Sequence, residues 1–285
     1  MYQKAINTKK GAIILDARIK DFFKKENIEY YAVLDYKDAK EIKPRLRERG
    51  NIEAKSVVIF LLPYYAGEVE NLSRYAAALD YHIIIKDVTA RLAETIEDIY
   101  PGSKAIGFGD HSPIDERSAA LSSGLGILGK NGLLINEKYG SYVFIADVIT
   151  DVSPKLIGAI KPQPVLMCEG CELCKKACPT GILRNESVEC LSAITQKKGE
   201  LSENEVQMML KYNTVWGCDI CQSVCPHNIN PKETPIDFFK KSRITCLNAE
   251  RLEAMSDEEF EKRAFAWRGR KTVERNVKHY ENEKK

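Results

Sequence analysis

The first 167 residues of this 285-residue chain contain no cysteine, although the whole chain has nine. A disulfide framework is therefore excluded from that part, and all thiol chemistry is confined to the region from Cys168 onward. Three prolines, Pro154, Pro162 and Pro164, lie just before this break in composition and are typical of a linker. We interpret the break as a domain boundary.

The sequence also lacks a long apolar run. The longest, around residues 56–66, is interrupted by Pro63 and falls short of the roughly 18–20 residues that span a membrane, so we expect no membrane partner. Residues 1–10 lack the pattern of a secretory signal peptide. We therefore expect a cytoplasmic protein, in which reduced thiols favour metal ligation over disulfides.

Net charge is small, at +2, which excludes a chain that is a polyelectrolyte over its whole length. Residues 261–285, however, carry nine Lys or Arg against four Glu, a local charge of +5 that leaves −3 on the rest. Such a basic tail either contacts an anion, for example a nucleic acid, or forms a solvated surface helix. Charge alone does not separate these two interpretations.

Hydrophobic spacing predicts alternating helices and strands before the first cysteine. Helical spacing occurs at residues 12–25, 71–99 and 114–123, and again at 202–211 and 256–265. Strand patterns occur at residues 28–34, 56–62, 104–108, 133–135 and 142–149. The alternation predicts an α+β protein whose N-terminal part is an α/β sandwich-like domain, with a sheet covered by helices.

The first cysteine run has the spacing of bacterial ferredoxins. It follows the pattern C-x-x-C-x-x-C-x-x-x-C-P and consists of Cys168, Cys171, Cys174 and Cys178, followed by Pro179. In this pattern three cysteines on a tight loop turn toward one cubane cluster, and the fourth points toward a second cluster. The run therefore predicts a ferredoxin-like domain with two clusters.

A second cysteine set lies about 50 residues further on and supplies the remaining ligands. It contains Cys218, Cys221 and Cys225, followed by Pro226, while Val215 stands where one more cysteine is expected and Cys190 is the replacement. Because each fourth cysteine serves the other cluster, we predict two [4Fe–4S] clusters. The first is held by Cys168, Cys171, Cys174 and Cys225, and the second by Cys178, Cys190, Cys218 and Cys221.

Structural zinc is the competing interpretation of the same cysteines. Zinc favours two separated C-x-x-C pairs in each site, which leaves the third cysteine of the run and both Cys-Pro endings without a role. The spacing therefore favours iron and sulfur. Cys246 is left over, and we expect it to be a buried small hydrophobic residue. A cluster with four thiolate ligands has no open position, so the chemistry must take place elsewhere, in the cysteine-free part.

The segment from Gly107 to Ser141 is rich in glycine and polar residues. Gly124, Gly126, Gly129 and Gly132 fall within nine residues, an arrangement that lets backbone amides approach a ligand. No P-loop pattern is present, and the G-x-G at residues 124–126 is not a complete dinucleotide-binding fingerprint.

Two other polar groups leave a structural and a functional interpretation open. Asp110, His111 and Asp115 surround the end of the strand predicted at residues 104–108, where carboxylates often face a ligand. Alternatively, Asp110 or Ser112 caps a helix that begins near Pro113. His82, in the long predicted helix, is more often packed or solvated than a ligand.

Several short motifs occur in a fixed order along the chain. They are Asp80-Tyr81-His82, Gly109-Asp110-His111-Ser112-Pro113, Gly124-Leu125-Gly126, Gly129-Lys130-Asn131, Gly140-Ser141, the first cysteine run with Pro179-Thr180-Gly181, and Gly217-Cys218-Asp219-Ile220-Cys221-Gln222. Together they resemble the epoxyqueuosine reductase family, which catalyses the last step of queuosine synthesis in tRNA. The resemblance covers roughly residues 50 to 275 and is weak before residue 50.

The resemblance implies a reductase that binds cobalamin, which the clusters reduce, and acts on epoxyqueuosine in tRNA with an external electron donor. By the same resemblance Asp110 is the catalytic proton donor, and Lys130, Asn131 and Ser141 contact cobalamin. The D-x-H-x-x-G motif that ligates cobalt elsewhere is absent, since Asp80-Tyr81-His82 lacks the glycine. This agrees with a family that binds cobalamin without a protein histidine.

These expectations give a functional division of the chain. Residues 1–160 form the cobalamin- and substrate-binding domain, 161–235 the two-cluster domain, and 236–285 a helical basic segment. Family members commonly carry a further C-terminal helical-repeat domain, whereas this sequence stops at Lys285, so we expect a short form in which tRNA as substrate is less secure. Two alternatives stay open: a related corrinoid reductase of a small molecule, for example a halogenated compound, and a two-cluster electron carrier without catalysis of its own.

Overall fold

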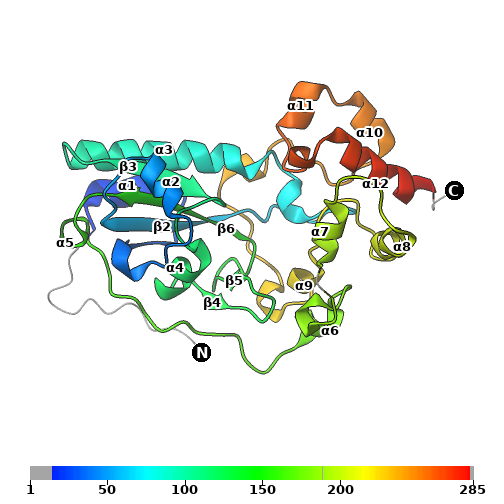
Figure 1. Cartoon of the computed structure of the whole chain (residues 1–285), viewed down its shortest axis with the longest axis horizontal. Helices are drawn as coiled ribbons and strands as arrows, with labels where there is room; N and C mark the ends of the chain where they lie inside the picture. The colour runs from blue at the N-terminus through cyan, green and yellow to red at the C-terminus, as the bar shows by residue number, and fades with distance from the viewer. Residues whose placement is uncertain (1–14, 188, 283–285) are drawn as a thin grey trace. The chain divides into compact units, whose positions relative to one another are not determined.

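The computed structural model describes residues 15–187 and 189–282, and its mixture of helices and strands confirms the predicted α+β class (Figure 1). Two compact units are present, each built from segments that are not contiguous. The first comprises Met1–Leu61, Ile85–Leu125 and Ile145–Val165, and the second Leu62–Ile84, Gly126–Phe144 and Leu166–Lys285. These compact units do not coincide with the predicted functional domains 1–160, 161–235 and 236–285. The functional division stays a prediction.

A four-stranded sheet, with the order β1-β2-β6-β3, is the framework of the first unit. The strands are β1 (Tyr31–Asp35), β2 (Ser56–Pro63), β3 (Ala105–Gly109) and β6 (Val143–Thr150). β1 is antiparallel to β2, with Tyr31 opposite Phe60, and β3 is antiparallel to β6, with Phe108 opposite Asp147. Every residue of β2 is buried, as expected for a continuous apolar run in a central strand.

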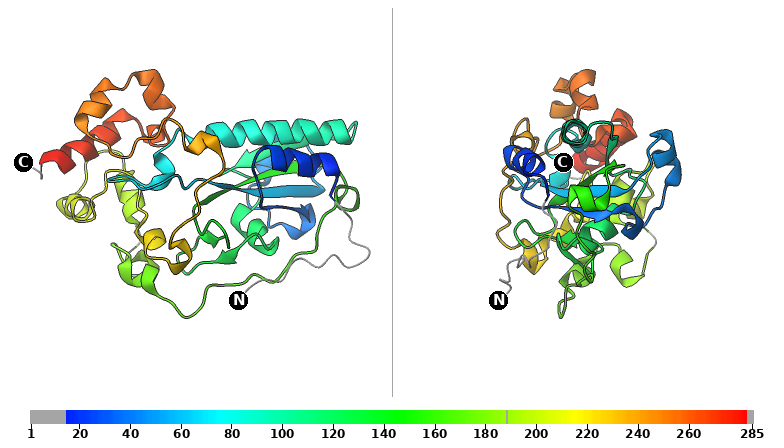
Figure 2. Two further views of the ribbon diagram at one scale, coloured as in Figure 1. Left: turned by 180° about the vertical axis from the view of Figure 1, so that it is seen from behind. Right: turned by 90° about the vertical axis from the view of Figure 1, so that its left-hand side faces the viewer.

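Helices cover both faces of this sheet. Helices α1 (Ala17–Lys25) and α3 (Tyr81–Ile99) lie on one face, and α4 (Glu116–Ser122) lies on the other (Figures 1 and 2). Helix α3 packs closely on β3, since a Cβ added at Gly107 would meet Thr89 Cβ at 2.2 Å. Short helices α2 (Pro44–Arg49) and α5 (Pro154–Ile157) complete the unit.

Two helices predicted from the sequence are shorter in the structure. The prediction for residues 71–99 was wrong at its start, because α3 begins at Tyr81 and is preceded by a 3₁₀ turn at Arg74–Ala76. Ile83, expected to face inward, is 44% exposed. The helix expected at residues 12–25 is α1, and residues 12–14 of that expectation lie outside the described residues.

The second unit contains the cysteines. A two-stranded sheet, β4 (Ile127–Leu128) and β5 (Leu134–Ile135), precedes them. The helices that follow are α6 (Leu173–Ala177), α7 (Leu191–Thr195), α8 (Glu203–Lys211), α9 (Ile220–Ser223), α10 (Ala249–Ala254), α11 (Asp257–Glu261) and α12 (Arg270–Asn282). No helix among the described residues is long and apolar enough to cross a membrane.

Sequence signals explain several ends of these helices. Ser202 and Ser256 form complete capping boxes at the starts of α8 and α11. Helix α11 ends at Glu261, earlier than the expected residue 265, because the chain then turns into the apolar core, where Phe265 is fully buried. Helix α12 fits the predicted helical basic segment, of which residues 283–285 lie outside the described part of the chain.

Candidate iron–sulfur centre and active site

The first predicted ligand set consists of Cys168 and Cys171 on the loop before α6, Cys174 on α6, and Cys225 after α9. Burial raises the pKa of Cys174, and the neighbouring Cys168 and Cys225 raise it further. Burial likewise raises the pKa of Cys225, with Cys168 and Cys171 as its thiol neighbours. The structure therefore places Cys225, from the second motif, beside the first three cysteines of the run.

Three cysteines of the second predicted set also lie together. Burial, together with nearby Cys190 and Cys221, raises the pKa of Cys218 to about 12. Burial and Cys190 raise the pKa of Cys221 to about 12 as well. Cys190 therefore lies near Cys218 and Cys221, and its role as the replacement ligand stays a prediction. Cys178 is buried and lies 3.9 Å from the Thr180 hydroxyl, and its place in this set stays a prediction.

The two residues outside these sets have simple structural explanations. Val215, which stands where a ligand cysteine is expected, is fully buried in the apolar core of the second unit beside Trp216. Cys246 is only partly buried, so the expectation of a buried residue was wrong. Its position at the end of an irregular loop before Leu247 leaves part of the side chain exposed.

Hydrogen-bond donors lie near two of the cysteines that the sequence predicts as cluster ligands. Among residues 15–187 and 189–282, no three Cys, His, Asp or Glu side chains converge closely enough to hold one metal ion. The Lys130 backbone N–H donates to Cys168 Sγ at 3.2 Å. The buried Asn131 Nδ2 has no hydrogen-bond partner among the described residues, while its amide lies near Cys221 and lowers the pKa of that thiol against the larger effect of burial. Donors aimed at thiolates are typical of cluster surroundings.

The Gly-Cys-Asp-Ile-Cys-Gln motif is held in place by residues far away in the sequence. Asp219 accepts hydrogen bonds from the Ser73 hydroxyl and from the Arg74 backbone N–H at 2.7 Å, and it forms an ion pair with the Arg74 guanidinium at 3.2 Å. Gln222 Nε2 donates to the Ser141 carbonyl at 3.0 Å. These contacts fix the backbone from which Cys218 and Cys221 project.

The residues predicted to contact cobalamin lie among these same loops. The Lys130 amine forms an ion pair with Glu172 at 3.3 Å. The Ser141 hydroxyl accepts hydrogen bonds from Gln222 at 3.1 Å and from Asn228 at 2.9 Å. Their role as cobalamin contacts stays a prediction, as does that of Asn131.

Asp110 lies at the turn between β3 and α4 in the first unit. Its backbone has φ of 62°, the left-handed region that non-glycine residues rarely adopt. Its backbone N–H donates to Glu116 Oε1 at 3.1 Å. The sequence-based alternative that Asp110 or Ser112 caps a helix at Pro113 was wrong, because α4 begins at Glu116 and Asp115 is its N-cap, accepting from the Ser118 N–H at 3.1 Å.

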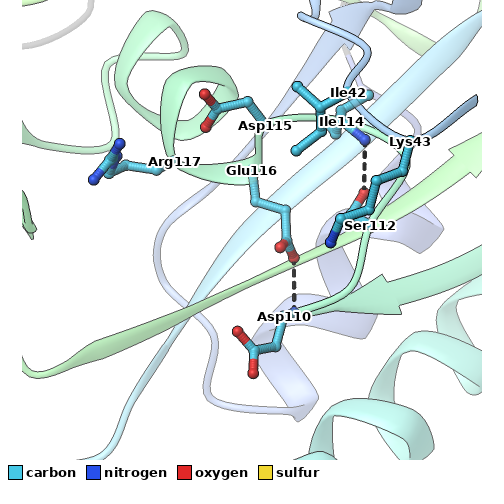
Figure 3. A pocket seen from close by; sticks show the side chains of 8 residues that line it. All are labelled: Ile42, Lys43, Asp110, Ser112, Ile114, Asp115, Glu116 and Arg117. Atoms are coloured by element: carbon cyan, nitrogen blue, oxygen red, sulfur yellow. Dashed lines mark hydrogen bonds between the residues drawn. The ribbon is translucent and has the colours of Figure 1, made fainter. Parts of the chain in front are cut away.

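This turn borders a cavity of about 230 Å³. Its lining is shown in Figure 3 and comprises Ile42, Lys43, Asp110, Ser112, Ile114, Asp115, Glu116 and Arg117. Pockets for drug-sized ligands have volumes of roughly 300–1,000 Å³, and cobalamin is larger than such ligands. The cavity beside Asp110 therefore has room for a small polar group.

Two acids beside Asp110 escaped the sequence analysis. Glu116 lines the cavity, and Asp147 is fully buried on β6. The sequence could have indicated Asp147, because it is the one charged residue in the otherwise apolar segment 142–149. Glu116 gave no such signal, because an acidic residue in the first turn of a helix is ordinary.

Grouped thiols on a mixed α and β fold, with a strained aspartate at the end of a strand, define an iron–sulfur oxidoreductase. The family described as "4Fe-4S double cluster binding domain" matches residues 167–228, and "Epoxyqueuosine reductase QueG, DUF1730" matches residues 47–110.

Curated relatives extend the match over most of the chain. The epoxyqueuosine reductase of Leadbetterella byssophila is 36% identical over 71% of this chain and 68% of its own length. That of Gloeobacter violaceus is 32% identical over 77% of this chain and 73% of its own length. The chain belongs to the epoxyqueuosine reductase family.

A solved structure agrees with this fold. An epoxyqueuosine reductase crystallised with an epoxyqueuosine-modified tRNA-Tyr stem loop superimposes with a TM-score of 0.74 at 24% identity, covering 92% of this chain and 79% of that chain. At this identity the likeness concerns the fold.

Proposed function

We propose that this chain converts epoxyqueuosine to queuosine in tRNA, using electrons that pass through two [4Fe–4S] clusters to bound cobalamin. The observation that carries the substrate is an identity of 32–36% to epoxyqueuosine reductases over about two thirds or more of both chains. A relative of the same fold is known with an epoxyqueuosine-modified stem loop. An external one-electron donor supplies the reducing equivalents.

The reaction needs two electrons and two protons, because an epoxide becomes an alkene and its oxygen leaves as water. Cobalamin, when bound, would supply a redox-active metal that passes electrons to the epoxide, a role that clusters with four thiolate ligands do not take. The two thiol groups described above hold the clusters that deliver the electrons. The number of clusters, two per chain, and the binding of cobalamin are both proposed here.

Asp110 is the proton donor in this proposal. It is exposed at the end of β3, so its carboxyl is accessible to a substrate. Its backbone adopts the left-handed conformation, which directs the side chain of the residue away from the strand that precedes it. A general acid of this kind contributes roughly 10²–10⁴-fold to the rate. The leaving oxygen takes one proton from Asp110, and solvent supplies the other.

The test is conversion by the complete holoprotein. The chain is reconstituted without oxygen with iron, sulfide and cobalamin, then given a one-electron donor and an epoxyqueuosine-containing stem loop. Mass spectrometry of the released nucleosides is expected to show the loss of one oxygen, only when both cobalamin and reductant are present. A preparation that holds clusters and cobalamin, binds the stem loop and leaves the epoxide intact would refute the proposal.

A further inference from the structure

Asp147 presents an unusual buried charge in the first unit. It lies in the middle of β6, opposite Phe108 of β3, and its exposure is 0%. Neither carboxylate oxygen has a hydrogen-bond partner at good distance and angle among the described residues, although the Ser112 hydroxyl and the Glu116 carboxyl face it. Burying an ionised carboxylate without hydrogen-bond donors costs free energy. A proton or a nearby positive charge would remove this cost for Asp147.

The groups that face Asp147 are Ser112 and Glu116. As long as both carboxyls are ionised, each can only accept hydrogen bonds, so of the two groups that face Asp147 only the Ser112 hydroxyl can donate. One proton on either carboxyl supplies the missing donor and removes one of two like charges. Burial raises the pKa of Asp147, and burial together with the charge of Asp147 raises that of Glu116.

Glu116 connects this pair to Asp110. Its Oε1 accepts the Asp110 backbone N–H at 3.1 Å, and Figure 3 shows the Asp110 carboxylate pointing away from Glu116. Left-handed backbone costs about 1–2 kcal/mol for a residue with a side chain. The hydrogen bond to Glu116 is therefore a contact that keeps the Asp110 turn in its strained form.

From this geometry we infer that Glu116 and Asp147 share one proton and act as a positioning pair for Asp110. Glu116 holds the backbone of Asp110, and buried Asp147 holds the Glu116 carboxyl. The inference rests on the proposed role of Asp110 as proton donor and adds two residues to it. The other charged groups that face Glu116 are Asp110 and Lys43, whose amine also contacts His111 Nδ1 at 3.2 Å.

The shared proton makes this arrangement sensitive to alkaline pH. Loss of the proton leaves two adjacent buried negative charges, which pushes the Glu116 carboxyl away from Asp147 and loosens its contact with the Asp110 N–H. Activity is then expected to fall on the alkaline side because kcat decreases, while KM for the stem loop stays nearly constant.

The pair also has a consequence for stability, with a definite sign. Burial raises the pKa of Glu116 to about 8 and that of Asp147 to about 7. The folded protein therefore holds a shared proton that the unfolded chain releases above about pH 5. The stability that this proton contributes is full at acid pH and is lost as the pH rises to about 8.

The experiment uses the reconstituted full chain and the variants Glu116→Gln, Glu116→Ala and Asp147→Asn. Glutamine keeps an acceptor for the Asp110 N–H and gives Asp147 a permanent donor, whereas alanine removes both. We expect Glu116→Gln to be at least about tenfold more active than Glu116→Ala, with an alkaline limb shifted to higher pH. Glu94→Gln, which removes an exposed carboxylate on α3, is the matched control and keeps the wild-type pH profile.

A readout without activity separates this inference from the proposed function. Infrared difference spectroscopy of the wild type at pH 7 is expected to show a protonated carboxyl band that is absent from Asp147→Asn and present in Glu94→Gln. Denaturant titrations are expected to lose stability between about pH 5 and 8 in the wild type and less in Asp147→Asn. No such band, or an unchanged alkaline limb in Glu116→Gln, overturns the inference. A chain with the band but no conversion of the stem loop refutes only the proposed function.

Discussion

At the residue scale, the proposed functional side chains differ from ordinary surface groups in their backbone conformation and in their burial. Asp110 combines exposure with left-handed backbone, and the cluster cysteines are partly or fully buried. Burial raises the pKa of several of these thiols, so the thiolate form that binds iron is stabilised chiefly by the metal itself. Folding around the clusters and cluster assembly are therefore coupled.

The role of Asp110 is best tested with asparagine. Alanine would remove the carboxyl and also tolerate left-handed backbone poorly, whereas asparagine accepts that conformation readily and keeps the side-chain shape. We expect Asp110→Asn to lower kcat by roughly 10²-fold or more, with iron content and the midpoint of unfolding unchanged. Single-turnover assays measure the rate. Retention of more than a third of the wild-type rate would exclude Asp110 as the proton donor.

At the scale of elements, the two cysteine motifs are predicted to exchange their fourth ligands, so that each motif serves both clusters. Double substitutions distinguish the crossover from a simple assignment of each motif to its own cluster. Cys190→Ser with Cys218→Ser removes ligands of one cluster and is expected to leave about four irons, while Cys190→Ser with Cys225→Ser damages both and leaves fewer. Iron analysis and electron paramagnetic resonance measure the outcome.

The ninth cysteine provides the matched control for this experiment. Cys246 belongs to neither thiol group, so Cys246→Ser is expected to keep the full iron content. Equal iron loss in the two double variants, or a loss in Cys246→Ser, would contradict the assignment of ligands.

The close packing of α3 on β3 offers a test of the fold. A methyl group at Gly107 would meet Thr89 Cβ at 2.2 Å and its backbone carbonyl carbon at 3.1 Å. Since a backbone cannot yield as a flexible side chain does, Gly107→Ala is expected to destabilise the protein by about 1–3 kcal/mol. The control is Ala105→Ser, at the start of the same strand. Gly102→Ala is not a suitable control, because Gly102 has left-handed backbone (φ of 87°) that alanine would strain. A denaturation midpoint for Gly107→Ala within error of the wild type would show that the packing is looser.

The sequence predicts an element well when neighbouring residues determine it, and poorly when contacts with distant segments determine it. The strands at β2 and β6 follow from apolar runs, and the cysteine sets follow from spacing. The start of α3 does not, because residues 71–80 have helical spacing but are tied to distant segments, for example by the Ser73 N–H to the Trp216 carbonyl at 2.7 Å. The Glu116–Asp147 pair likewise depends on the register of β3 and β6, which no local pattern encodes.

At the scale of the whole molecule, a net charge of only +2 means that the proposed contact with tRNA depends on a local patch of positive charge. Part of the basic tail serves internal structure: Arg270 donates to the Leu252 carbonyl at 2.8 Å and Arg275 to the Lys197 carbonyl at 2.8 Å. Lys271 and Lys278 remain exposed on α12. They are the natural candidates for phosphate contacts if the tail binds tRNA.

We expect Lys271→Glu with Lys278→Glu to weaken stem-loop binding and to reduce its dependence on salt, because each phosphate contact contributes close to one unit to the slope of log K against log salt. The measurement is fluorescence anisotropy with a labelled stem loop over a range of salt concentrations. Glu274→Gln, on the same helix, is the control that does not remove a cation. If the slope of log K against log salt is the same in the double variant as in the wild type, Lys271 and Lys278 do not contact phosphates of the stem loop.

The central claim is that one chain holds two iron–sulfur cubanes and works with cobalamin. The most direct measurement is metal and corrinoid analysis after reconstitution and gel filtration without oxygen. The account predicts about eight irons, about eight sulfides and one corrinoid per chain, with negligible zinc. Bound zinc, about four irons, or a chain that retains no corrinoid would contradict it.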